Sequence, residues 1–281
     1  MWAGPTGDAD RTGTAGEVRL RLDVSYDGAG FHGFAENRGV RTVGGELRAA
    51  LERVLGQELA LTCAGRTDTG VHARGQVVSV TVRPRAGRPD DPVALRDALN
   101  GLLGPEVVVG RVSEVPADFD ARFSARSRTY RYRVLNRPVP DPFLARTSWW
   151  VAEPLDRHAM DEACIPLLGE HDFSSFCRRP RGRDDLSLVR RVTEARWVSG
   201  EVAAGLEPGT GVAGAEGVID LWLTASAFCH QMVRSITGLL VDVGRGRRTP
   251  ADVTAALVAA DRSTVPSLAP PHGLTLWRVG Y

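Results

Sequence analysis

Hydrophobic residues in the first half of the chain follow strand and helix patterns in turn. From Val18 to Val24, apolar residues alternate with charged ones, which predicts a strand with one wet face. From Val43 to Leu55, apolar residues recur at helical spacing, and Gly56 ends that predicted helix. The remaining patterns complete a β-α-β-β-α-β order, with strands at about Leu59–Ala64 and Gln76–Val82, a helix opened by Asp91-Pro92, and a strand at Glu106–Val112.

The second half repeats this order of patterns without repeating the sequence. The helical stretch Asp156–Gly169 contains Pro166, which should interrupt or kink it. Apolar residues from Phe228 to Val243 predict a further helix, and Thr249-Pro250 opens a short one. The glycine- and alanine-rich residues 201–217 predict a flexible surface loop. The predicted strands are Arg128–Leu135, Leu188–Val198, Val218–Ala225 and Leu274–Val279.

Two successive β-α-β-β-α-β patterns predict the α+β fold class, with two ferredoxin-like units whose antiparallel or mixed sheets are flanked by helices. We place the boundary between the units near Glu114–Pro116. The predicted organisation is a disordered tail over residues 1–16, an N-terminal α+β domain over 17–113 and a C-terminal α+β domain over 114–281.

Composition narrows the possible chemistry more than it narrows the fold. The 281 residues are 43% hydrophobic with a net charge of +1, which excludes a histone-like polycation and an acidic disordered regulator but allows a locally basic face. All 35 basic side chains are arginine, so Schiff-base catalysis, a lysine general base and a P-loop lysine are excluded. The missing lysine need not reflect function, because drift toward GC-rich codons also replaces lysine by arginine.

The four cysteines, Cys63, Cys164, Cys177 and Cys229, contain no C-x-x-C pair. They predict reduced, partly buried thiols in a cytosolic protein rather than disulfides or a zinc site. No apolar run approaches the roughly 20 residues that span a bilayer, and the first residues lack the features of a signal peptide. We therefore expect a cytoplasmic location.

The densest chemical signal is the segment AGRTDTGVHARGQVV, residues 64–78. Asp68 is its only carboxylate, with Arg66 before it and Arg74 after it. A carboxylate near guanidinium groups stays ionised and can act as a nucleophile or a base. An aspartate in a glycine- and threonine-rich loop also commonly bonds its own backbone in an Asx-turn. The residue pattern alone leaves both interpretations open.

This segment resembles the active-site signature of the tRNA pseudouridine synthase A (TruA) family. The resemblance runs from about Arg19 to Tyr281 and favours the catalytic interpretation of Asp68 over the turn. It continues, in family order, through YDGAGFHGF, FDARFSARSRTYRYRV, GEHDFSSFC, FCHQMVRSITG and HGLTLWRV.

The resemblance implies a pseudouridine synthase fold and isomerisation of uridine to pseudouridine in the anticodon stem-loop of tRNA, at tRNA positions 38 to 40. In such an enzyme Asp68 is the nucleophile that attacks a flipped-out uridine. Attack on the ribose and attack on the uracil ring both stay open. The resemblance also implies a homodimer that binds tRNA and needs neither cofactor nor metal.

Two further catalytic residues follow from the resemblance. Tyr130 matches the first tyrosine of the family's R-x-Y-x-Y run, where its ring can stack on the flipped base and its hydroxyl can assist a proton transfer. An ordinary packed strand tyrosine is the alternative, which suits Tyr132 as well. Arg234 matches the arginine of the MVR motif, placed to pair with Asp68 and keep it ionised. The alternative is a surface arginine on an amphipathic helix.

Several residues are candidates for RNA or substrate binding. Arg66 is expected to contact phosphate or enter the gap left by the flipped nucleotide, although a loop-bracing salt bridge is the alternative. Leu274 would pack on the uracil face or in the core. His72 would contact RNA or, like many loop histidines, bond to backbone. Arg178 and Arg179 belong to a basic cluster with Arg181, Arg183, Arg190 and Arg191, which provides phosphate contacts or a solvated charged face.

The sequence also departs from the family pattern. GFAEN at residues 33–37 stands where the family has GWQxQ, Gly44 stands where glutamine is common, and Gln231 stands where histidine is frequent. These departures leave two alternatives open, namely a pseudouridine synthase acting on another RNA and a catalytically silent RNA-binding relative. A small-molecule hydrolase is disfavoured because no obvious acid-base partner accompanies Asp68.

Overall fold

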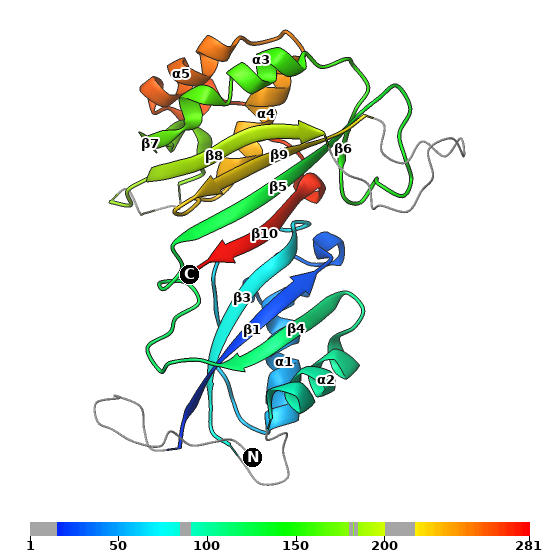
Figure 1. The fold of residues 1–281 in the computed structure, drawn as a ribbon, viewed down its shortest axis with the longest axis vertical. Helices are drawn as coiled ribbons and strands as arrows, with labels where there is room; N and C mark the ends of the chain where they lie inside the picture. The colour runs from blue at the N-terminus through cyan, green and yellow to red at the C-terminus, as the bar shows by residue number, and fades with distance from the viewer. Residues whose placement is uncertain (1–15, 85–90, 180–181, 183–184, 200–216) are drawn as a thin grey trace. The chain divides into compact units, whose positions relative to one another are not determined.

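The computed structural model describes residues 16–84, 91–179, 182, 185–199 and 217–281 (Figure 1). Nearly all of the predicted tail over residues 1–16 and of the predicted loop over residues 201–217 lies outside the described residues. The chain divides into two compact units, which we describe separately. Unit 1 comprises residues 1–126 and 276–281, and unit 2 comprises residues 127–275.

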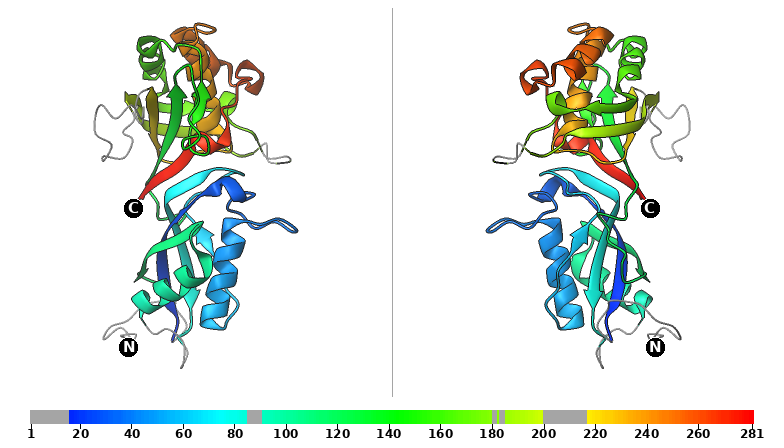
Figure 2. Two further views of the ribbon diagram at one scale, coloured as in Figure 1. Left: turned by 90° about the vertical axis from the view of Figure 1, so that its right-hand side faces the viewer. Right: turned by 90° about the vertical axis from the view of Figure 1, so that its left-hand side faces the viewer.

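Unit 1 is built on strands in the order β4-β1-β3-β10, with the short β2 paired to β3. The pairs β4–β1, β1–β3 and β2–β3 are antiparallel. Its two helices, α1 and α2, lie on the same face of these strands (Figure 2). The strands are β1 (Val18–Tyr26), β2 (Thr62–Cys63), β3 (His72–Val82), β4 (Val107–Glu114) and β10 (Leu274–Gly280), and the helices are α1 (Val43–Leu55) and α2 (Pro92–Leu103).

Local sequence signals set the ends of both helices in unit 1. The Thr42 hydroxyl accepts a hydrogen bond from the Gly45 N–H at the start of α1, and Gly56 ends the helix at φ +66°. The Asp91 carboxylate accepts hydrogen bonds from two N–H groups in the first turn of α2.

The predicted order β-α-β-β-α-β is confirmed for the elements from β1 to β4.

Unit 2 has strands in the order β5-β9-β8-β7, and β6 runs parallel to β5. Helices α3, α4 and α5 gather beside this sheet (Figure 1). The elements are β5 (Ser127–Asn136), β6 (Trp149–Val151), α3 (Arg157–Glu162), β7 (Gly169–Asp172), β8 (Val189–Ser199), β9 (Val218–Ala225), α4 (Met232–Gly244) and α5 (Pro250–Ala259). The α+β class is confirmed.

The helix predicted over Asp156–Gly169 is right at its start and wrong at its end. α3 stops at Glu162, a 3-10 turn follows at Ile165–Leu167, and Gly169 begins β7. Pro166 lies inside that 3-10 turn, as expected of a residue that cannot donate a helical hydrogen bond. The predicted repeat of the first half is thus modified by β6, β7 and a second consecutive helix, α5.

An ion pair is buried between two strands of unit 2. Arg133 on β5 lies opposite Asp220 on β9 in the antiparallel register. The guanidinium donates two hydrogen bonds of 2.8 and 2.7 Å to the two carboxylate oxygens, and the side chains are only 10% and 5% exposed. This bidentate geometry satisfies both charges away from water.

The prediction of four reduced thiols is wrong for one pair. Cys177 and Cys229 form a disulfide, with their Cα atoms 5.8 Å apart. Cys177 follows the 3-10 turn Ser174–Phe176, and a backbone hydrogen bond from Arg178 to His230 holds the two segments together beside the bridge. Cys63 and Cys164 are free thiols, as predicted. The bridge joins residues 52 positions apart, which local spacing could not reveal.

Candidate active site

Asp68 lies in the loop that connects β2 to β3 in unit 1. Its side chain is half-buried, Arg66 on one side of it is exposed, and Thr67 between them is buried. The Val71 N–H donates to the Asp68 carbonyl, and Gly70 between them adopts φ +76°. The loop therefore turns tightly just after the aspartate, and glycine supplies the required backbone conformation.

A fully buried glutamine on β3 fixes the start of this loop. Gln76 on β3 is 0% exposed, and its side-chain amide donates to the Gly65 carbonyl (2.6 Å) while its oxygen accepts from the Gly65 N–H (3.4 Å). The same amide donates to the Tyr26 hydroxyl, which shares a hydrogen bond of 2.8 Å with the Thr67 hydroxyl. Neutral groups thus hold the residue immediately before Asp68.

The glycine-rich segment after β1 forms a wall against the same loop. The Phe34 N–H donates to the Thr67 carbonyl (3.0 Å), and the Gly70 N–H donates to the Phe31 carbonyl (3.3 Å). Gly33 has φ +88°, and a Cβ placed there would lie 2.7 Å from the Thr67 carbonyl oxygen. Only glycine fits this close approach, so the YDGAGFHGF and AGRTDTGVHARGQVV motifs form one packed structure.

His72 lies at the end of the loop and is only 6% exposed. Its Nδ1 is 3.1 Å from the Gly28 nitrogen and 3.1 Å from an Asp27 carboxylate oxygen. This matches the backbone-bonded alternative considered for a loop histidine. Arg74, the next arginine along, lies over the Trp277 ring at 4.9 Å from its centroid.

The cysteine nearest to Asp68 is not a competing nucleophile. Burial raises the pKa of Cys63 to about 11, against the opposing effect of the nearby Arg66 charge. Because the thiolate is the reactive form, Cys63 is inert near neutral pH. Asp68 stays the candidate nucleophile of this loop.

The site residues predicted in unit 2 lie on β5, on α4 and at the start of β10, whose first two residues belong to unit 2. Tyr130 on β5 is buried, and the Phe228 ring meets it edge-on with ring centroids 5.0 Å apart. Arg234 on α4 is half-buried and donates from Nε to the Ala269 carbonyl (2.8 Å). Leu274 at the start of β10 is buried.

Tyr132 is distinguished from Tyr130 by its surroundings. It is 0% exposed, and its hydroxyl donates to the Pro270 carbonyl (2.7 Å). Burial raises its pKa well above the usual range, and the positive charge of Arg234 acts in the opposite direction. A Cβ on Gly273 would lie 2.7 Å from its ring. Tyr132 therefore supports the segment that carries Ala269 and Leu274.

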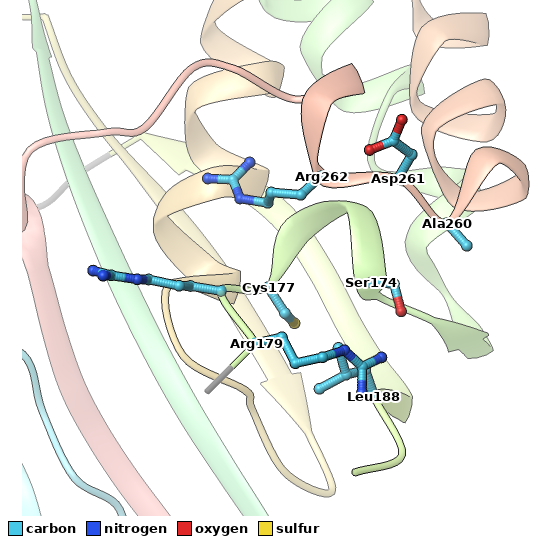
Figure 3. Close-up of a pocket in the computed structure, with 8 residues that line it drawn as sticks. Ser174, Cys177, Arg179, Leu188, Ala260, Asp261 and Arg262 are labelled. Carbon is cyan, nitrogen blue, oxygen red and sulfur yellow. The ribbon is translucent and has the colours of Figure 1, made fainter. Parts of the chain in front are cut away.

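Arg178 and Arg179 line a pocket of about 370 Å³ on unit 2 (Figure 3). Arg178 is exposed and Arg179 is half-buried, with one guanidinium nitrogen donating to the Leu186 carbonyl. Arg181 and Arg183 of the same predicted cluster lie outside the described residues. Arg191 pairs with Glu170 at 3.3 Å.

Within the described ranges, no group of three or more histidine, cysteine, aspartate or glutamate side chains is placed to hold a metal ion. In the same part of the chain, no helix is both long enough and apolar enough to cross a membrane.

Comparison with known proteins identifies the family. A sequence profile described as tRNA pseudouridine synthase matches residues 24–124 and 163–281. The chain belongs to this family. The matched segments contain Asp68, Arg234 and Leu274 but not Tyr130. As a tRNA pseudouridine synthase family member, the protein is an enzyme of the isomerase class.

Curated relatives resemble the chain over almost its whole length. The tRNA pseudouridine synthase A of Streptomyces griseus is 42% identical over 95% of this chain and 89% of its own length. That of Frankia casuarinae is 43% identical over 95% and 91%, and that of Brevibacillus brevis is 40% identical over 94% and 99%. Family membership therefore does not depend on the Asp68 segment alone.

Sequence reasoning missed the residues that hold Asp68 in place. Gln76 was assigned only as the start of a strand, and neither Tyr26 nor Thr67 was singled out. A weak signal was present, because Gln76 is a polar residue directly before a run of valines in a buried strand. Phe228 was similarly expected on a helix but lies before α4 and contacts Tyr130.

Proposed function

We propose that the protein isomerises uridine to pseudouridine in the anticodon stem-loop of tRNA, at tRNA positions 38 to 40, with Asp68 as the nucleophile. The observation that carries this proposal is a half-buried carboxylate on a loop held from two sides by neutral hydrogen bonds, in a chain of this family. Such a loop keeps a reacting carboxylate in one geometry before substrate arrives.

The reaction needs no change in atom count. Asp68 attacks the flipped-out nucleotide, at the ribose or at the uracil ring, and the N-glycosidic bond breaks. The uracil stays bound, rotates and forms a carbon–carbon bond from its C5 to C1′ of the ribose, and the bond to the aspartate breaks. C5 then loses its proton while N1, no longer bonded to the ribose, gains one, so the product is an isomer of the substrate. The released aspartate is ready for another cycle, so the chain's own residues supply the nucleophile.

Four other residues assist in this proposal. Arg234 pairs with the Asp68 carboxylate and orients it. Tyr130, with Phe228 against its ring edge, stacks on the uracil and assists proton transfer, and Leu274 packs on the other apolar surface of the base. Arg66, which is exposed beside Asp68, contacts RNA phosphate or fills the gap left by the flipped nucleotide.

For His72 we propose a positioning role, because little of its ring is accessible and it contacts the Asp27–Gly28 turn. Arg178 and Arg179 contact the RNA backbone. We further propose a cytoplasmic homodimer of two-unit chains whose units are variants of a ferredoxin-like arrangement, in which one subunit grips the tRNA while the other receives the target base.

The test is to express the chain in cells that lack their own enzyme for these positions and to map pseudouridine across all RNAs. Asp68→Asn removes the nucleophilic charge with little change in shape, and Asp97→Asn, on an exposed position of α2, is the matched control. We expect pseudouridine in anticodon stem-loops for the unaltered chain and for Asp97→Asn. For Asp68→Asn we expect a loss of at least about 1,000-fold, as is typical when an enzymatic nucleophile is removed, with tRNA binding retained.

Other outcomes identify the alternatives. Pseudouridine found only in ribosomal RNA would show a synthase of different substrate range. Binding of tRNA without any pseudouridine would show a catalytically silent relative. Full activity of Asp68→Asn would contradict the assignment of the nucleophile.

A further inference from the structure

The pocket of about 370 Å³ on unit 2 is surrounded by arginines from distant parts of the chain. Arg178 and Arg179 follow the 3-10 turn Ser174–Phe176, whereas Arg262 begins the 3-10 turn Arg262–Thr264 after α5. Buried Cys177 and Leu188 contribute apolar lining between them. Figure 3 shows the Arg179 and Arg262 side chains on opposite walls of the pocket.

Two of these cations lack a carboxylate among the described residues. The Arg178 guanidinium makes no hydrogen bond or ion pair there, and Arg262 donates from one nitrogen only, to the carbonyls of Ser175 and Val265. Within the described residues, the other N–H groups of Arg262 donate no hydrogen bond. Partial burial lowers the pKa of Arg262. This direction is expected for a cation that loses water contacts without gaining an opposite charge.

Many other arginines among the described residues pair with carboxylates. Arg48, for example, bonds both Glu36 and Glu52, and Arg248 pairs with Asp252. The one carboxylate that lines the pocket, Asp261, accepts hydrogen bonds from the N–H and hydroxyl of Ser263. The pocket therefore keeps an excess of positive charge.

We propose that this pocket binds two successive phosphodiester groups of the RNA strand, away from the target nucleotide. The Arg179 and Arg262 guanidinium groups extend toward opposite ends of the pocket (Figure 3), so a ligand with two separated anionic groups fits better than a single inorganic phosphate. Arginine suits such a ligand because its planar fork binds phosphate oxygens in pairs. The inference depends on the proposed function, since it takes RNA as the ligand, and it adds Arg262 to the RNA-binding residues.

The experiment measures the affinity of the full-length protein for an unmodified tRNA transcript between 50 and 200 mM salt. Arg178→Ala removes a side chain with no partner in the described structure. Arg262→Ala removes the opposite wall, and Arg262→Lys keeps the charge if the alanine variant folds poorly. The matched control is Arg248→Ala, an equal charge change in the same unit at a carboxylate-paired arginine.

We expect Arg178→Ala and Arg262→Ala each to weaken tRNA binding about three- to tenfold and to reduce the salt slope by about 0.7–0.9 for each phosphate that the variant no longer binds. KM for tRNA should rise with kcat unchanged, and Arg262→Lys should keep most of the salt slope. Arg248→Ala should behave like the unaltered protein. Melting temperatures identify any variant that does not fold.

Equal slopes for all four variants and the unaltered protein would overturn the proposal. So would equal losses of affinity in Arg178→Ala and Arg248→Ala, which would indicate a general charge effect. Pyrophosphate binding that depends on Arg262 while tRNA affinity does not would assign the pocket to a free anion and also overturn it. In each case pseudouridine formation by the unaltered chain tests the proposed function independently.

Discussion

The Asp68 loop of unit 1 and the interior of unit 2 are held by different kinds of interaction. The loop is fixed by neutral hydrogen bonds among Tyr26, Thr67, Gln76 and backbone groups. Unit 2 instead contains the buried Arg133–Asp220 ion pair and the Cys177–Cys229 disulfide.

The difference shows where the protein tolerates fixed charge. A buried ion pair is a strong constraint because charges interact strongly in a low-dielectric surrounding. Neutral hydrogen bonds from Tyr26, Thr67 and Gln76 fix the geometry of the loop that carries Asp68. Unit 2 instead uses an ion pair and a covalent bridge, which are stronger and less adaptable constraints.

Breaking the buried ion pair should produce the largest loss of stability. Asp220→Ala leaves the Arg133 guanidinium buried without its carboxylate, which costs about 3–5 kcal/mol of the free energy of unfolding. Chemical denaturation measures this loss. Replacing both residues together, with Arg133→Met and Asp220→Leu, should recover most of it because no unpaired charge remains. An unaffected single variant would show that water reaches Arg133.

Removing the disulfide should have the next largest effect. Cys177→Ser with Cys229→Ser should lower the free energy of unfolding by about 2–4 kcal/mol, since the bridge closes a long loop in the unfolded chain. The matched control is Cys164→Ser, a buried free thiol. Thiol titration of the denatured, unreduced protein should find two thiols, and reduction should expose all four. Four thiols without reductant would contradict the bridge.

The smallest effect on stability, with a specific effect on catalysis, is expected in the neutral network. Gln76→Leu leaves the Gly65 N–H and carbonyl without side-chain partners, which costs about 1–3 kcal/mol. The loop then loses its fixed geometry, so kcat should fall while tRNA affinity stays unchanged. Gln57→Leu, whose amide bonds the Arg83 backbone at an exposed position, is the control. Equal kcat for both variants would show that Gln76 supports the fold but does not position Asp68.

Much of the fold could be predicted because its signals are local. The capped helix Val43–Leu55 and the alternating strands follow from periodicity and from residues such as Gly56 and Asp91. The strands β6 and β7 were missed because three and four residues are too short to display a period. Pro166 was recognised as an interruption, but the turn from helix to strand at Gly169 depends on pairing with β8.

The candidate site was predictable where its chemistry lies in one motif. Asp68 is identified by the segment around it, while its support comes from Tyr26 and Gln76, 50 positions apart in the chain. The disulfide and the Arg262 wall of the pocket likewise join segments that only the fold brings together. Such contacts leave no regular spacing in the sequence.

The last residues of the chain complete the sheet of the first unit. From Leu276 onward, β10 belongs to unit 1, where it lies beside β3, and a Cβ on Gly75 would come within 2.4 Å of the Trp277 carbonyl oxygen. The Tyr281 hydroxyl donates to the carbonyl of Ala121, which belongs to the first of the two chain segments that form unit 1. During synthesis, the last residues of β10 leave the ribosome after all of unit 2, although they belong to unit 1. A chain that is shortened by a few residues at its C-terminal end would therefore lack part of unit 1, most of which is synthesised first.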